Sequence, residues 1–121
     1  MGQSLSARQR SALSAGATLA DVEKVLADTR TAQAEAAAEY DRQKARSLDP
    51  HVDAKDAREA RYAASDAEYE RDRNAAAIEN LERKVRALKE RDEEEKRKLD
   101  LAAAIEAVSY THLTLPTIYS V

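Results

Sequence analysis

Apolar residues recur along residues 57–102 in alternating steps of three and four, which is the spacing of a heptad repeat. The repeat keeps one register throughout, and neither Gly nor Pro interrupts it. Such a period puts a narrow apolar stripe on one side of a helix, and the stripe has to pack against another helix. The stripe positions are Ala57, Ala60, Ala64, Ala67, Arg71, Asn74, Ile78, Leu81, Val85, Leu88, Asp92, Glu95, Leu99 and Ala102.

The stripe changes character along its length. It begins with alanine, becomes aliphatic in its central part, and is then interrupted by two carboxylates, Asp92 and Glu95. Alanine favours the helix but buries little surface, so the aliphatic part is expected to carry most of the packing. The predicted partner-binding seam therefore consists of Ile78, Leu81, Val85, Leu88 and Leu99.

A shorter helix is predicted over residues 18–47, before this stripe. The Thr18 hydroxyl is placed to accept a hydrogen bond from a free backbone N–H, and Asp21 carries the charge that a helix N-terminus favours. The connection is predicted at residues 48–50. Pro50 disfavours helical geometry at Asp49 and suits the first turn of a helix over 51–107, with Asp49 as its cap.

A short connection between two long amphipathic helices makes them antiparallel neighbours. The sequence therefore predicts an all-α fold, an antiparallel helical hairpin or coiled coil whose long second helix extends beyond the first. Folding the chain about residue 49 brings Leu19 and Val22 to Ile78 and Leu81. The same register predicts one polar layer, which would fix the pairing, from Thr29, Gln33, Arg71 and Asn74.

The first segment, residues 1–17, is rich in Ser, Ala and Arg. We expect it to be mostly disordered, because an isolated helix as short as residues 7–14 is marginal in water. Gly2 follows the initial Met, and Ser6 stands four residues further on, as in an N-myristoylation signal. This pattern indicates an alternative function, an N-myristoylated, membrane-anchored coiled-coil adaptor. One acyl chain alone, however, binds membranes only marginally.

The composition narrows the class of protein. Charged residues make up 36% of the 121 residues and aromatic residues 4%, which is too little large apolar surface for a sizeable globular core. Cysteine is absent, which excludes disulfides and thiol chemistry. The net charge of −3, with both signs interleaved, predicts no nucleic-acid partner. No apolar run is long enough to cross a bilayer, so we expect a cytoplasmic protein with little tendency to associate with membranes.

No set of residues indicates catalysis. His51 stands beside Asp49 and Asp53, but three ligands from one exposed turn are a poor set for zinc, and a solvated helix residue is the preferred interpretation. There is no Gly-rich phosphate loop and no Cys–His pair. The sequence predicts that the protein is not an enzyme and has no cofactor or metal.

Basic residues flank the seam, and they point to the kind of partner. In a parallel homodimer these residues would face one another across the interface, and Asp92 would oppose Asp92. We therefore expect a protein partner or oligomer through the second helix, with acidic residues flanking the partner helix; the alternative is a solvated charged face. The predicted function is a structural or protein–protein interaction module. The flanking residues are Lys84, Lys89, Arg91, Lys96 and Lys98.

Two tyrosines, Tyr62 and Tyr69, lie seven residues apart on the face away from the seam. Exposed rings in such a pair are either a docking spot or packed along neighbouring side chains. The spacing alone does not choose between these two interpretations.

The last segment differs in composition from the rest of the chain. Residues 108–117 read VSYTHLTLPT, which resembles the in-frame translation of a transposase mosaic-end sequencing adapter, and the residues Ala107 and Ile118 suit its two junctions. The resemblance implies that residues 108–121 are a non-native tail and that the protein is truncated. The rest of the chain resembles the Ala/Arg-rich coiled-coil proteins of bacteria and phages, in composition only, so no residue roles transfer.

Overall fold

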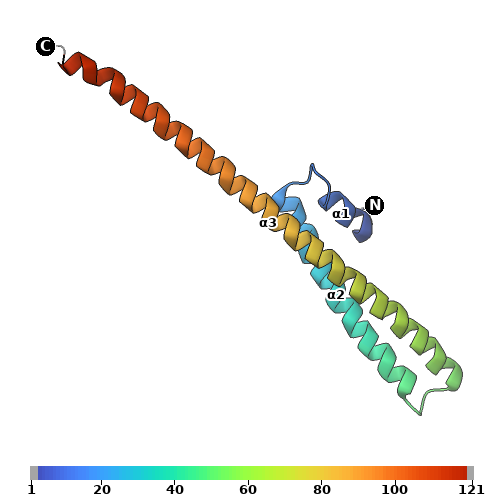
Figure 1. Cartoon of the computed structure of the whole chain (residues 1–121). Coiled ribbons are helices and arrows are strands. Elements are labelled where there is room, and N and C mark those ends of the chain that lie inside the picture. The colour runs from blue at the N-terminus through green and yellow to red at the C-terminus, as the bar shows by residue number, and fades with distance from the viewer. Residues whose placement is uncertain (1–2, 120–121) are drawn as a thin grey trace. The chain divides into compact units, whose positions relative to one another are not determined.

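The computed structural model describes residues 3–119, and the side chains of residues 3–107. It consists of three helices, α1 (Leu5–Ala12), α2 (Leu19–Leu48) and α3 (Ala54–Tyr119), as Figure 1 shows. Residues 3–119 contain no strand. The predicted all-α fold is confirmed.

The two long helices pack against each other as an antiparallel hairpin, which confirms the main prediction from the heptad pattern. Helix α2 has 30 residues and α3 has 66. The chain divides into two units, Met1–Arg86 and Ala87–Val121. The first unit contains α1, α2 and the part of α3 that pairs with them.

Helix α2 begins as its sequence predicts. Thr18 has extended backbone geometry, and its Oγ1 accepts a hydrogen bond from the Asp21 N–H at 3.2 Å. The hydroxyl thereby satisfies one of the free donors at the start of the helix.

The connection between α2 and α3 is longer than residues 48–50. Helix α2 ends at Leu48, and Asp49 is its C-cap, with its backbone N–H donating to the Arg46 carbonyl at 3.3 Å. The Asp49 carboxylate accepts the His51 N–H at 2.9 Å, a local bond that stabilises a turn. The prediction that Asp49 caps the second helix is therefore wrong, because its carboxylate is used within the turn.

Helix α3 begins at Ala54 rather than at residue 51, and Pro50 lies in the turn. Asp53 occupies the capping position instead. Its carboxylate accepts the Lys55 N–H at 3.3 Å, and its carbonyl accepts the Ala57 N–H at 2.8 Å.

The buried side chains are distributed unevenly along the hairpin. The largest fully buried side chains are Val22, Thr29 and Leu81, and Val25 and Leu26 add to them at the end away from the turn. Nearer the turn the buried side chains are small. They are Ala60, Ala64 and Ala67.

Polar contacts join the helices of the first unit. Thr29 of α2 and Asn74 of α3 both accept hydrogen bonds from the same side chain, Gln9 of α1. Across the hairpin, Arg30 of α2 forms an ion pair with Glu82 of α3 at 3.3 Å, and the Arg71 guanidinium of α3 lies 5.0 Å from the ring centroid of Tyr40 in α2. Both contacts join α2 to positions further along α3 than the predicted register does. They therefore do not support the predicted pairing of Leu19 and Val22 with Ile78 and Leu81.

The expectation of a disordered segment over residues 1–17 is wrong for residues 5–12, which form α1. Ser4 caps this helix by accepting the Ala7 N–H at 3.2 Å. Ala12 is buried, and Arg8 forms an ion pair with Asp28 of α2 at 2.6 Å. A helix too short to be stable alone is therefore held by contacts with the hairpin.

Candidate partner-binding surfaces

The five residues of the predicted seam fall into different environments. Leu81 is fully buried, and Ile78 and Val85 are half-buried, so these three belong to the first unit's packed interior or its edge rather than to an open surface. Leu88 is also buried. Leu99 is 71% exposed and is the seam residue that remains available to a partner.

In the second unit, every residue from 89 to 107 is exposed. Two large apolar side chains besides Leu99 lie in this segment, Leu101 at 61% and Ile105 at 57% exposure. The strict heptad pattern does not single out Ile105, because it stands one position before the stripe. Counting all apolar residues in the segment, rather than stripe positions alone, would have found it.

The predicted flanking cations are accessible. Lys89, Arg91, Lys96 and Lys98 are exposed, and Lys84, in the first unit, is half-exposed. Lys98 forms an ion pair with Glu94 one turn earlier, with 3.5 Å between Nζ and Oε1. Such an exposed pair contributes little to stability, so it leaves the ammonium group available for a partner.

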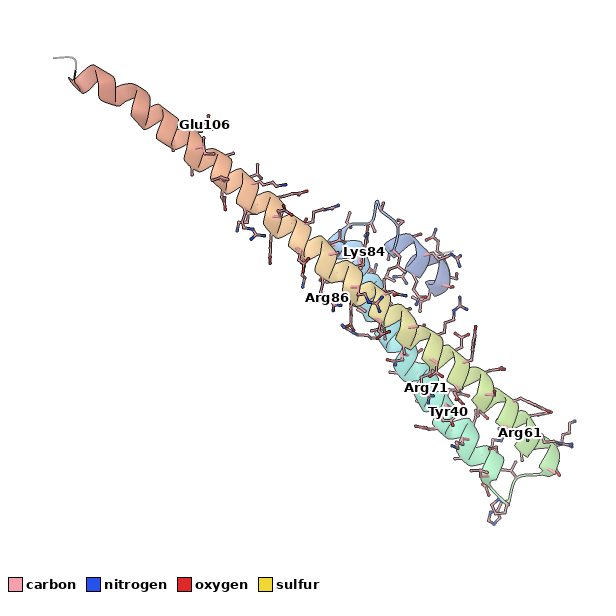
Figure 2. All side chains as sticks on the ribbon, in the orientation of Figure 1. Tyr40, Arg61, Arg71, Lys84, Arg86 and Glu106 are labelled. Carbon is pink, nitrogen blue, oxygen red and sulfur yellow. The ribbon has the colours of Figure 1, made fainter. Side chains whose placement is uncertain are left out.

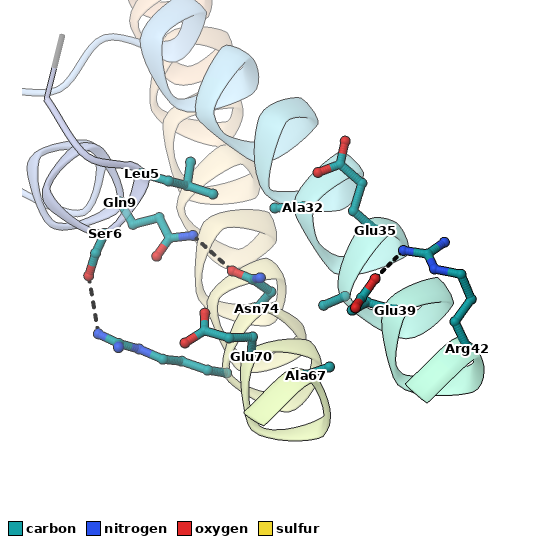
Figure 3. A pocket seen from close by; sticks show the side chains of 12 residues that line it. Leu5, Ser6, Gln9, Ala32, Glu35, Glu39, Arg42, Ala67, Glu70 and Asn74 are labelled. Carbon is teal, nitrogen blue, oxygen red and sulfur yellow. Dashed lines mark hydrogen bonds and ion pairs between the residues drawn. The ribbon is translucent and has the colours of Figure 1, made fainter. Parts of the chain in front are cut away.

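The first unit contains an open groove of about 570 Å³, which sequence reasoning missed. Leu5, Ser6 and Gln9 of α1 lie at one end, as Figure 3 shows. Its apolar lining from the two long helices is small, namely Ala32, Ala36 and Ala67. No single-helix pattern marks this groove, because its lining comes from all three helices.

The charged side chains of the groove differ in whether they are paired. Glu39 forms an ion pair with Arg42, and Arg73 donates a hydrogen bond to the Ser6 Oγ at 3.1 Å (Figure 3). Glu35 of α2 and Glu70 of α3 also line the groove, and neither has a hydrogen-bond or ion-pair partner among the described side chains. The groove charges without an ion-pair partner are therefore the two carboxylates and the Arg73 guanidinium, which bonds only the neutral Ser6 hydroxyl.

Glu39 is a groove residue whose pKa is shifted by its neighbours on α2. Its Oε1 accepts a hydrogen bond from the Gln43 Nε2 at 2.8 Å. This bond, with the Arg42 guanidinium as a second cause, lowers the pKa of the Glu39 carboxyl, because both interactions favour the charged form.

The predicted polar layer forms only in part. Thr29 and Asn74 are buried and meet through Gln9, as described above. Arg71 instead lies over the ring of Tyr40, 5.0 Å from its centroid, and Figure 2 shows the two side chains next to each other. A cation–π contact lets the guanidinium stay half-exposed, which costs less than burying it in a layer.

The remaining candidate residues stay outside any assembled site. Tyr62 and Tyr69 are 61% and 64% exposed, and the Arg61 guanidinium lies 5.5 Å from the Tyr62 ring centroid. His51 is exposed and lies 3.1 Å from an Asp49 oxygen. No group of three or more possible metal-ligating side chains occurs in the described part of the chain.

Two further predictions concern the ends of the chain. Gly2, on which the lipid-anchor alternative depends, lies outside the described residues, as do residues 120–121 and the side chains of residues 108–119. Among the described residues, no helix combines the length and the apolar character needed to cross a membrane.

Comparisons with protein-family models, with curated proteins and with solved structures found no match to this chain.

Proposed function

We propose that this protein is a structural protein–protein interaction module, which engages a helical partner through residues 89–107 of α3. One observation carries the proposal: three large apolar side chains, Leu99, Leu101 and Ile105, are more than half exposed on one short stretch of helix. Leu99 lies on the stripe, whereas Leu101 and Ile105, four residues apart, share another face of the helix. Exposed aliphatic side chains in one segment are a common property of surfaces that pack against another protein.

The charges beside these side chains describe the partner. Lys89, Arg91, Lys96 and Lys98 flank the stripe on both sides and are exposed. A partner helix with acidic residues at its own flanking positions would form favourable pairs with them, whereas basic flanks would repel. The hairpin then serves as the scaffold that carries this helix.

The test uses a synthetic helical peptide of four heptads with Leu in its core and Glu at its flanking positions. Two of its core positions are Lys, so that they can face Asp92 and Glu95. We expect the labelled peptide to bind the full chain in fluorescence anisotropy, and a matched peptide with Lys at the flanking positions not to bind. Equal binding of the two peptides, or binding of neither, would contradict the proposal.

A variant locates the contact on the chain. Leu99→Asp places a charge in the stripe and should weaken binding of the acidic peptide by at least about tenfold, which corresponds to about 1.4 kcal/mol. Leu48→Asp is the matched control, because Leu48 is also strongly exposed, at 74%, and lies outside residues 89–107, at the end of α2. It should leave binding unchanged.

A further inference from the structure

We propose that the groove of the first unit binds residues 96–105 of α3 from a second copy of this chain. The inference rests on the proposed function, because it assigns a partner to the same exposed segment. The two surfaces of the proposed contact are the groove lined by Glu35 and Glu70, and the stretch of helix centred on Leu99.

The groove has the shape and chemistry to receive a helix. Its apolar lining consists of the short side chains of Ala32, Ala36 and Ala67, which allow another helix to approach closely. Glu35 projects from α2 and Glu70 belongs to α3, so an unpaired carboxylate stands on each of the two helices that form the groove (Figure 3).

The exposed segment of α3 carries the complementary pattern. Leu99 is 71% exposed, and Ala102 follows it on the same stripe. At 3.6 residues per turn, Lys96 and Lys98 project on opposite sides of Leu99. A helix laid in the groove with Leu99 against the alanines therefore points one ammonium group toward each wall.

Charge complementarity favours this pairing over the pairing of two α3 segments with each other. Two stripes face to face in parallel would bring Asp92 against Asp92 and would set basic flanks against basic flanks. The groove instead offers the unpaired carboxylates of Glu35 and Glu70 to the lysines, with the Arg73 guanidinium also in its lining. Rim ion pairs of this kind add specificity and speed of association more than affinity, and the buried Leu99 supplies the apolar contact.

This contact joins two different surfaces, so it is heterologous, and every copy carries both of them. The test is therefore the dependence of molecular mass on concentration, measured for the full chain by sedimentation velocity. We expect the mass to rise as the concentration is raised toward about 1 mM, and to fall when salt screens the charges.

Charge reversal on each surface tests the pairing directly. The variant K96E/K98E presents acids to an acidic groove, and the variant E35K/E70K presents a basic groove to basic flanks. Each alone should weaken self-association by at least about tenfold in Kd. An equimolar mixture of the two variants should recover association, because each kind of contact in the mixed complex then joins opposite charges.

Two controls separate the contact from general effects of charge. Lys98→Glu should weaken association, whereas Arg97→Glu changes the net charge equally on the outward side of the helix and should not. All four reversed residues are exposed, so circular dichroism should show the helical content of wild type in every variant.

The outcomes distinguish the inference from the proposed function. A chain that stays monomeric at every concentration, or a mixture of variants that fails to associate, overturns the second-copy inference. If that monomeric chain still binds the acidic-flanked peptide, the proposed function stands and the partner is a different protein. If it binds no acidic-flanked peptide either, both proposals fail.

Discussion

Gln9 joins all three helices of the first unit. Its amide nitrogen lies 3.1 Å from the Thr29 hydroxyl and 3.5 Å from the Asn74 amide oxygen. The fully buried Thr29 hydroxyl also donates to the Val25 carbonyl at 2.7 Å, so it is satisfied both as a donor and as an acceptor. Among the described residues, no buried side-chain polar atom lacks a partner.

Replacing Gln9 with alanine should therefore destabilise the first unit. We expect a loss of about 1 kcal/mol in the free energy of unfolding, because the Asn74 amide oxygen loses its donor and the Thr29 hydroxyl loses one of its two hydrogen bonds. Urea denaturation followed by circular dichroism measures this change. Gln3→Ala, at an exposed position, is the control, and equal stability of the two variants would show that the Gln9 bonds contribute nothing.

Glu39 gives a prediction about pH. Because its pKa is lowered in the folded chain, chiefly by the Gln43 hydrogen bond, its contribution to stability is present above the pKa of the unfolded chain. That contribution is lost as the pH falls through the folded value. We expect an NMR titration to give the Glu39 carboxyl a pKa below the ordinary value for a glutamate.

The variant Gln43→Ala should move the Glu39 pKa back toward its ordinary value, because the main cause of the shift is removed. Gln33→Ala on the same helix is the control. A Glu39 that titrates at the same pH in wild type and in Gln43→Ala would contradict this explanation.

At the scale of helices, a regular period made much of the structure predictable. The heptad stripe specified the long second helix, Thr18 specified where α2 begins, and the short connection specified an antiparallel pair. The start of α3 was placed three residues early, because Asp49 and Asp53 are both good caps and the sequence does not show which carboxylate is used within the turn.

Helix α1 was missed for a different reason. Its eight residues have no strong pattern of their own, and what holds them is tertiary: the Arg8–Asp28 ion pair, the Gln9 bonds and the burial of Ala12. The groove went unseen for the same reason, since α1 forms one end of it. Contacts between segments distant in the sequence are not visible to a test of local periodicity.

The packing of α2 against α3 should depend strongly on Leu81. This side chain is fully buried, so Leu81→Ala should cost about 2–5 kcal/mol, from lost apolar contact and the cavity left behind. Chemical denaturation measures the loss. Leu48→Ala, at a position 74% exposed, should change stability by less than about 0.5 kcal/mol, and similar effects of the two variants would argue against this core.

At the scale of the whole chain, we propose that residues 108–121 derive from adapter sequence rather than from the gene. The motif VSYTHLTLPT supports this proposal. Resequencing the source DNA from uncontaminated material should give different codons after codon 107. Recovery of the same codons there would contradict it, and the residues used in both functional proposals lie before that point.

The uneven interior of the hairpin has a mechanical consequence. Valine and leucine hold the open end, where the chain enters α2, while only alanines are buried toward the covalent turn, and Leu48 beside that turn is exposed. Burial of a larger side chain contributes more free energy to the packing of the two helices. Their packing is therefore weakest near the turn, where the backbone already links them. Heating should therefore separate the two helices first near the loop. The separation should then extend toward the end where α2 begins.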